Sequence, residues 1–211
     1  MTPAQRRAWI ISRLDPIDAY DPAGAAAQSD FDLNPGLLPD HVHATRPAAV
    51  LVGLVEREEG LTVLLTRRSD TLRSHTGQIA FPGGRCDAGE TPWETALREA
   101  QEEVGLDPAL VSVVGMLNGY QTVTGFHVRP VVGFIDPAAV FTASPDEVAD
   151  VFETPFDFLM DPDNHQRQHR DVPGGERRHF YAMPWNDRFI WGATAGMLRG
   201  FYERLHGPDQ E

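Results

Sequence analysis

The chain has 211 residues, of which 41% are hydrophobic and 23% charged. This length supports one substantial core but is short for two independent domains, and the composition is that of a folded globular protein rather than a disordered or fibrous one. The 18 basic and 31 acidic side chains give a formal charge of −13, which disfavours binding to nucleic acid or to an anionic membrane. A single cysteine excludes an intrachain disulfide, and no secretory signal or long apolar run is present, so we expect a cytoplasmic protein.

Residues 1–45 differ in composition from the rest, and we treat them as an N-terminal extension to a single domain over residues 46–211. The extension is expected to hold a short helix over residues 4–14 and to be irregular elsewhere. Two apolar segments then flank a short polar turn, which predicts a hairpin of buried strands. The helical pattern that follows begins at Pro92 and ends at Val104.

The second half of the chain predicts further strands over residues 111–117 and 128–135. Ser144 to Glu147 supplies a capping hydroxyl, a proline and an acid, which predicts the start of a second helix. Residues 161–177 are polar and are expected to form a long loop. Short strands around residues 179–183 and 189–190 then precede a final helix over residues 192–205. Strands interleaved with helices indicate a mixed α/β architecture.

The helix over residues 92–104 carries the clearest chemical signal. Three glutamates, Glu99, Glu102 and Glu103, stand three and four residues apart and therefore share one flank of the helix. Clustered carboxylates repel one another, and hard oxygen ligands of this kind suit a divalent cation such as Mg²⁺ or Mn²⁺. An ordinary exposed acidic face on a surface helix is the alternative reading of the glutamates alone.

The spacing around this helix resembles the signature of the Nudix hydrolase family, Gly-x5-Glu-x7-Arg-Glu-U-x-Glu-Glu-x-Gly-U. The matching residues are Gly84, Glu90, Arg98, Glu99, Glu102, Glu103, Gly105 and Leu106. Ala100 departs from it, because the pattern asks for a bulkier residue there. The resemblance implies a Nudix fold, in which a mixed β-sheet is sandwiched between helices (α/β/α).

The same resemblance implies roles for individual residues. Glu99, Glu102 and Glu103 would hold the Mg²⁺ or Mn²⁺ ions together with the backbone carbonyl of Gly84, and Glu90 would pair with Arg98. The implied reaction is hydrolysis of a nucleoside diphosphate linked to another group. Glu102 or Glu103 could also accept the proton of the attacking water, and a glutamate in a later loop, for which Glu147 is the candidate, could do so instead. The identity of the base stays open at this point.

The segment immediately upstream resembles the additional signature of the coenzyme A pyrophosphatase branch of the family, LLT-x-RS-x3-R-x3-G-x3-FPGG. The matching residues run without a gap from Leu64 to Gly84 and include Arg68, Arg73 and Gly83. Arginine binds phosphate oxygens through two parallel hydrogen bonds, and glycine lets the backbone approach a phosphate closely. The resemblance implies that CoA or acyl-CoA is cleaved to 3′,5′-ADP and (acyl-)4′-phosphopantetheine, with Arg68, Arg73 and Gly83 as substrate-binding residues.

Two other functions remain open for the sequence. One is a Nudix hydrolase that acts on ADP-ribose or another nucleotide sugar. The other is a non-catalytic module that binds CoA or a nucleotide on the same fold. The partner is in every case a small molecule, and the apolar, Pro-rich extension could contribute to a homodimer.

Overall fold

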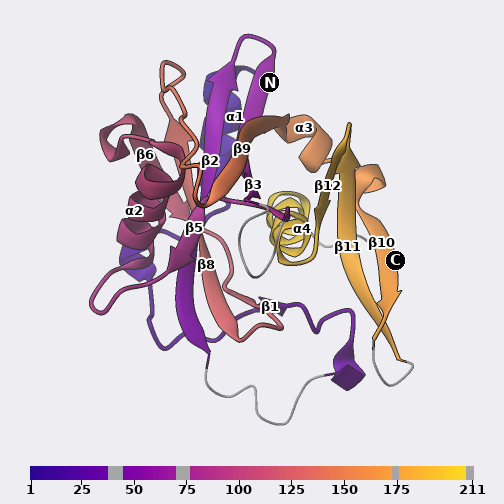
Figure 1. Ribbon diagram of the computed structural model, residues 1–211. Coiled ribbons are helices and arrows are strands. Elements are labelled where there is room, and N and C mark those ends of the chain that lie inside the picture. The colour runs from indigo at the N-terminus through magenta and orange to yellow at the C-terminus, as the bar shows by residue number, and fades with distance from the viewer. Residues whose placement is uncertain (38–44, 70–76, 173–175, 208–211) are drawn as a thin grey trace.

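The computed structural model describes residues 1–37, 45–69, 77–172 and 176–207 (Figure 1). Within these ranges nine strands form one mixed sheet, whose main path runs in the order β1-β7-β8-β2-β3-β4. The strands are β1 (Gln28–Ser29), β2 (Arg46–Arg57), β3 (Gly60–Arg68), β4 (Ile79–Ala80), β5 (Gly83–Arg85), β6 (Val111–Met116), β7 (Tyr120–Gln121), β8 (Phe126–Ile135) and β9 (Val148–Pro155). Short 3₁₀ turns occupy Ile17–Ala19, Pro35–Leu37, Pro108–Leu110 and Pro162–Asn164.

The centre of the sheet is the pair of β2 and β8, which run parallel in register from Arg46 opposite Phe126 to Val55 opposite Ile135. Strands β2 and β3 form the predicted antiparallel hairpin, which turns between Arg57 and Gly60. Both central strands are apolar along most of their length, as expected for strands covered on both faces. These predictions of strands from the sequence are confirmed.

Helices cover the two faces of the sheet, and this arrangement confirms the predicted fold. Helix α2 (Pro92–Val104) packs on one face, where Ala96, Ala100 and Val104 are fully buried against the sheet. On the other face lie α1 (Pro3–Ile11), α3 (Phe156–Leu159) and α4 (Ala193–His206), which contribute to a second core cluster (Figure 1).

A second, three-stranded antiparallel sheet lies beyond α4, so that α4 is placed between the two sheets (Figure 1). Its strands are β10 (Gln166–Asp171), β11 (Arg177–Trp185) and β12 (Arg188–Trp191). The prediction of a long loop over residues 161–177 is therefore wrong where β10 lies. All six residues of β10 are polar and give no apolar alternation, but each one pairs with a residue of β11.

The predicted helix start at Ser144 is also wrong. The residues form a single turn, in which the amides of Glu147 and Val148 donate to the carbonyl of Ser144 at 3.0 and 2.8 Å. The chain then enters β9, which pairs with β3 from Val148 to Pro155. The capping signal at Ser144 therefore produces only one turn, because pairing of the following residues with β3 outweighs it.

The first 37 residues pack closely against the rest of the protein. Ile10 of α1 is fully buried in the cluster around α4, and β1 adds a parallel strand beside β7. The Asn34 side chain accepts a hydrogen bond from the amide of His179 at 2.7 Å and donates to its carbonyl at 2.9 Å. Among the described residues, no helix is both long and apolar enough to cross a membrane.

Candidate active site

Helix α2 has the ends that the sequence predicts. Thr91 caps the N-terminus in a capping box with Glu94, and Gly105 ends the helix in the left-handed conformation at φ 65°. The apolar residues of the helix face the sheet, and this orientation fixes the flank that carries the three glutamates. Their side chains differ in exposure, from 5% at Glu103 through 15% at Glu99 to 58% at Glu102.

Glu103 is the buried member of the group and contacts both sequence motifs. Its Oε2 accepts a hydrogen bond from the amide of Gly83 at 3.2 Å. Its Oε1 lies 3.9 Å from Nη1 of Arg68. Glu103, a candidate metal ligand, therefore lies next to both the glycine-rich loop and Arg68, the first arginine of the upstream motif.

Arg98 lies among the other acids. Its guanidinium makes two hydrogen bonds to Glu90, at 2.8 and 3.1 Å, as the family resemblance implies for this pair. One further nitrogen, Nη1, donates to Glu99 at 2.9 Å and to Glu102 at 3.2 Å. The Glu90 carboxylate also accepts from the hydroxyl of Thr95 at 2.8 Å, so the loop before α2 is tied to the helix.

Gly84 lies directly against the carboxylate of Glu99. A Cβ added at Gly84 would stand 2.5 Å from Cδ and Oε1 of Glu99 and 2.6 Å from Oε2. Only glycine leaves room for this approach. The Gly84 backbone and the Glu99 carboxylate are therefore neighbours, as expected if both contribute oxygen ligands to one ion.

The pKa values of the acids diverge because their surroundings differ. Burial raises the pKa of Glu103 to about 7, and the negative charges of Glu99 and Glu147 add to this, whereas the Gly83 amide and Arg68 act against it. Burial also raises the pKa of Glu99, with Arg98 acting against it. By contrast, the hydrogen bonds from Arg98 lower the pKa of Glu90 to about 2.

These residues fit a hard divalent cation by their chemistry. Carboxylate and carbonyl oxygens are the ligands that Mg²⁺ and Mn²⁺ prefer, and an exposed Glu102 can move to complete a coordination shell. In the described part of the chain, no three acidic, His or Cys side chains stand close enough to chelate one ion as they are. In the structure, Nη1 of Arg98 donates hydrogen bonds to Glu99 and Glu102, whereas Nε and Nη2 donate to Glu90. The bonds to Glu99 and Glu102 could therefore give way to an ion while those to Glu90 stay in place.

A β-bulge positions Arg68 at this site. The register between β3 and β9 shifts between Arg67 and Arg68, so that Arg68 pairs with Val148. Bulges of this kind redirect a side chain at the end of a strand. Next to the bulge, the amide of Ser69 donates to the carbonyl of Glu147 at 2.8 Å, which places Glu147 beside the site even though the predicted helix is absent.

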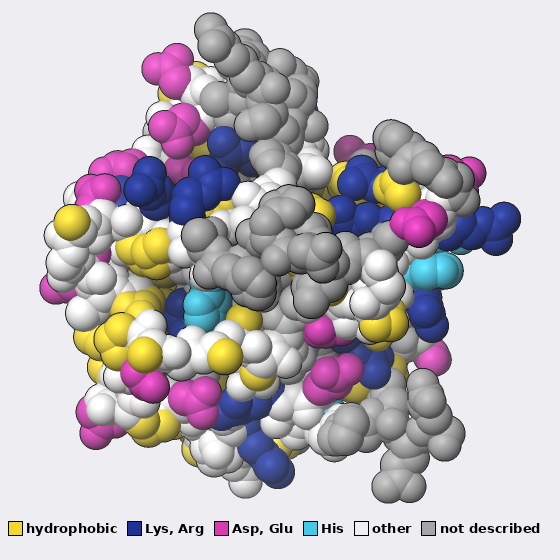
Figure 2. All heavy atoms as spheres, turned by 90° about the horizontal axis from the view of Figure 1, so that it is seen from below, with side chains coloured by type: hydrophobic (Ala, Val, Ile, Leu, Met, Phe, Trp, Pro, Cys, Tyr) yellow, Lys and Arg dark blue, Asp and Glu magenta, His cyan; other side chains and the backbone are white. Residues whose placement is uncertain are grey.

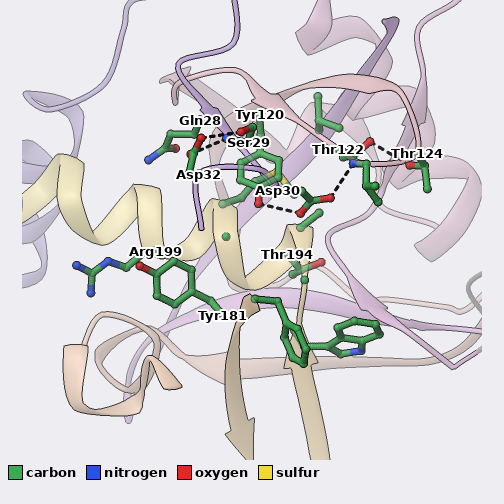
Figure 3. A pocket seen from close by; sticks show the side chains of 18 of the residues that line it. Gln28, Ser29, Asp30, Asp32, Tyr120, Thr122, Thr124, Tyr181, Thr194 and Arg199 are labelled. Carbon is green, nitrogen blue, oxygen red and sulfur yellow. Dashed lines mark hydrogen bonds between the residues drawn. The ribbon is translucent and has the colours of Figure 1, made fainter. Parts of the chain in front are cut away.

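Arg68 is one of the residues that line a cavity of about 1120 Å³. Its walls include Asp30 and Tyr120 on one side and Tyr181 and Thr194 on the other, as Figure 3 shows. Phe180, Tyr181 and Trp191 also line it. From the sequence alone these aromatic residues could stack on adenine, but aromatic residues on late strands more often fill a core, and the sequence therefore favours a core role.

The structure thus brings together most of the residues that the sequence singles out. Glu103 contacts Gly83 and lies near Arg68, Gly84 lies against Glu99, and Arg98 links Glu99 to Glu102. Arg73 lies outside the described residues.

Comparisons with known proteins show the family to which the chain belongs. The NUDIX domain model matches residues 44–176. A protein from Pectobacterium atrosepticum described as "Uncharacterized Nudix hydrolase NudL" is 42% identical over 185 residues, which cover 84% of this chain and 94% of that relative. A protein of the same description from Cronobacter sakazakii is 48% identical over 158 residues, covering 73% and 80% of the two chains.

Among solved structures, the Nudix hydrolase RenU from M. Smegmatis matches with a TM-score of 0.46 and 23% identity, over 53% of this chain and 71% of RenU. The family model covers more than half of the chain, and the two relatives exceed 40% identity over most of their length. The chain belongs to the Nudix hydrolase family.

Proposed function

We propose that this protein hydrolyses the diphosphate bond of coenzyme A or acyl-CoA and releases 3′,5′-ADP and (acyl-)4′-phosphopantetheine. The observation that carries the proposal is the position of Arg68. This arginine belongs to the motif that resembles the CoA pyrophosphatase branch, lines the large cavity, and lies 3.9 Å from Glu103 of the general Nudix motif. A substrate in the cavity would therefore meet the two motifs together.

The carboxylates of Glu99, Glu102 and Glu103, with the Gly84 carbonyl, would hold Mg²⁺ or Mn²⁺. When bound, such ions neutralise phosphoryl oxygens and lower the pKa of a coordinated water. Arg68 and Gly83 would bind the anionic oxygens of the substrate, and Arg73 would assist from the same motif. Arg98 would keep the helix and the loop before it in place through Glu90.

The proton of the attacking water needs an acceptor. Glu102 and Glu103 belong to the cluster, and Glu147 lies close enough to raise the pKa of Glu103. An acceptor works best when its pKa is near the working pH. We propose that one of these three glutamates, Glu102, Glu103 or Glu147, accepts the proton.

Incubation of the protein with CoA and Mn²⁺ or Mg²⁺, followed by chromatography, tests the proposal. Release of 3′,5′-ADP is expected, with kcat/KM for CoA above that for ADP-ribose. Glu103→Gln should reduce turnover by about 10³-fold or more while the circular dichroism spectrum is unchanged. Glu94→Gln is the matched control, because Glu94 lies on the same helix but only caps it.

Preferred hydrolysis of ADP-ribose would show that the nucleotide-sugar alternative is correct. Binding of CoA without product in either metal would show that the protein is a non-catalytic module.

A further inference from the structure

One wall of the cavity is a face of the three-stranded sheet. Arg170 pairs with Arg178 across β10 and β11, and Ala182 of β11 pairs with Trp191 of β12. Because side chains alternate along a strand, Arg170, Arg178, Phe180 and Trp191 lie on the same face. All four line the cavity that Arg68 also lines. The cavity therefore extends from this face to Arg68, whose Nη1 lies 3.9 Å from Glu103.

The arginines of this face are held in place and still have hydrogen-bond donors to offer. Nη2 of Arg178 lies 3.4 Å from the Asp30 carboxylate, and its side chain is 15% exposed. Asp30 in turn accepts from the Tyr120 hydroxyl at 3.0 Å and from the amide of Val123 at 2.8 Å (Figure 3). A guanidinium carries five N–H donors, so the pair with Asp30 leaves donors on Arg178 for a ligand.

Arg170 is exposed and lies against a ring. Its guanidinium carbon is 5.6 Å from the centre of the Trp191 ring, a cation–π arrangement. Figure 2 shows Arg side chains gathered on the side of the molecule where the three-stranded sheet lies in Figure 1. In a protein of formal charge −13, a pair of arginines at a cavity wall is a local site for an anion.

The aromatic residues complete the chemistry of the face. The rings of Phe180 and Trp191 meet edge to face, with centroids 5.2 Å apart and planes at 62°. Half-buried rings in this arrangement stack readily with a third planar group such as a nucleobase. Two guanidinium groups beside two aromatic rings match a phosphorylated nucleoside, whereas an uncharged pantetheine arm has neither an anionic group nor a planar ring.

Building on the proposed function, we propose that this face binds the nucleoside half of the substrate, with the base against Phe180 and Trp191 and the 3′-phosphate against Arg170 and Arg178. The diphosphate then extends along the cavity toward Arg68. Asp30 is a positioning residue in this arrangement, because it contacts Arg178 and not the ligand.

Isothermal titration with 3′,5′-ADP and with 5′-AMP tests the site without any need for catalysis. The intact protein should bind 3′,5′-ADP more tightly than 5′-AMP. Arg170→Ala should weaken binding of 3′,5′-ADP about tenfold or more, the usual effect of losing a charge-assisted hydrogen bond, and should change 5′-AMP affinity by less than about twofold.

Arg167→Ala is the matched control. Arg167 belongs to the same strand and is exposed, but it is not among the residues that line the cavity. Its loss should leave both affinities unchanged. Arg178→Lys provides a second variant that keeps the ion pair with Asp30 but removes the planar fork, and it should reduce the preference for 3′,5′-ADP.

The result that overturns the site is equal behaviour of Arg170→Ala and Arg167→Ala, or parallel loss of both nucleotides in Arg170→Ala. Failure of the proposed function has a different signature: no product forms from CoA, while 3′,5′-ADP still binds in an Arg170-dependent manner. If both proposals hold, the ratio of kcat/KM for CoA to that for dephospho-CoA falls toward one in Arg170→Ala.

Discussion

Replacing Gly84 with alanine should move the carboxylate of Glu99 without changing the stability of the fold. The added Cβ would stand 2.5 Å from Cδ and Oε1 of Glu99, whereas ordinary contact begins at 3.4 Å, so the carboxylate must retreat by about 0.9 Å. The clash is with the far end of a flexible side chain rather than with backbone. The fold should therefore survive with a melting temperature within about 2 °C of the parent.

A displacement of about 1 Å in a catalytic arrangement costs on the order of 10²-fold in rate. We therefore expect Gly84→Ala to lower kcat/KM for CoA by about that factor and to require more Mn²⁺ for half-maximal activity. The assay is chromatographic detection of 3′,5′-ADP over a Mn²⁺ titration. Gly36→Ala is the control, because a Cβ at Gly36 meets nothing within 4 Å. Unchanged activity and Mn²⁺ dependence in Gly84→Ala would refute the role assigned to this contact.

Three further variants probe the surrounding structure. Gly83→Ala should destabilise the protein, with a lower melting temperature than Gly84→Ala, because its Cβ would stand 2.4 Å from the carbonyl oxygen of Ala49 in the backbone of β2. Asn34→Ala should lower the free energy of unfolding by about 1–3 kcal/mol, measured by urea denaturation, because it removes a buried partner of the His179 backbone. Burial alone would raise the pKa of Glu153, but hydrogen bonds from Arg57 and Thr62 outweigh burial and lower it. The resulting stability is present above the unfolded-state pKa of about 4.5 and is lost as pH falls through the lower folded-state value. The melting temperature of Glu153→Gln should therefore fall less steeply with decreasing pH than that of the parent.

Helix α2 shows which parts of the fold can be predicted from sequence. Its start, its end and its buried stripe all depend on residues within one or two turns, namely the Thr91 cap, Gly105 and the spacing of small apolar residues. The signals for the central strands are similarly local, since β2 and β8 each contain an apolar run. Local signals of this kind predict an element without knowledge of its partners.

The errors occur where a partner distant in the chain decides the structure. The residues from Ser144 carry a helix-start signal, but the chain that follows pairs with β3 and forms β9 instead. Strand β10 consists of polar residues that become a strand because β11 pairs with them. No periodicity within either segment reports the presence of that partner.

The candidate site divides in the same way. Helical spacing predicts that Glu99 and Glu103 share one flank of the helix. The fixed spacing of the motif predicts that Gly84 and Arg98 belong to the same site. The cavity could not be predicted, because its walls come from four separate regions, represented by Asp30, Tyr120, Arg178 and Trp191. A hydrogen bond and an ion pair join the first three of these residues, across 148 positions of the chain.

Under the proposed function, the surroundings of Arg68 and the three-stranded sheet differ in electrostatic character, and this difference would let an acidic protein accept an anionic substrate. Next to Arg68, the buried carboxylate of Glu103 shares a helix flank with Glu99 and Glu102, and clustered carboxylates favour a cation. At the three-stranded sheet, arginines meet the solvent on the cavity wall. A polyanion is repelled by the surface as a whole, whereas a small substrate whose charges match this order of positive and negative groups is not. On this proposal, the formal charge of −13 disfavours polyanions, and the local arrangement of arginines would select the anion that binds.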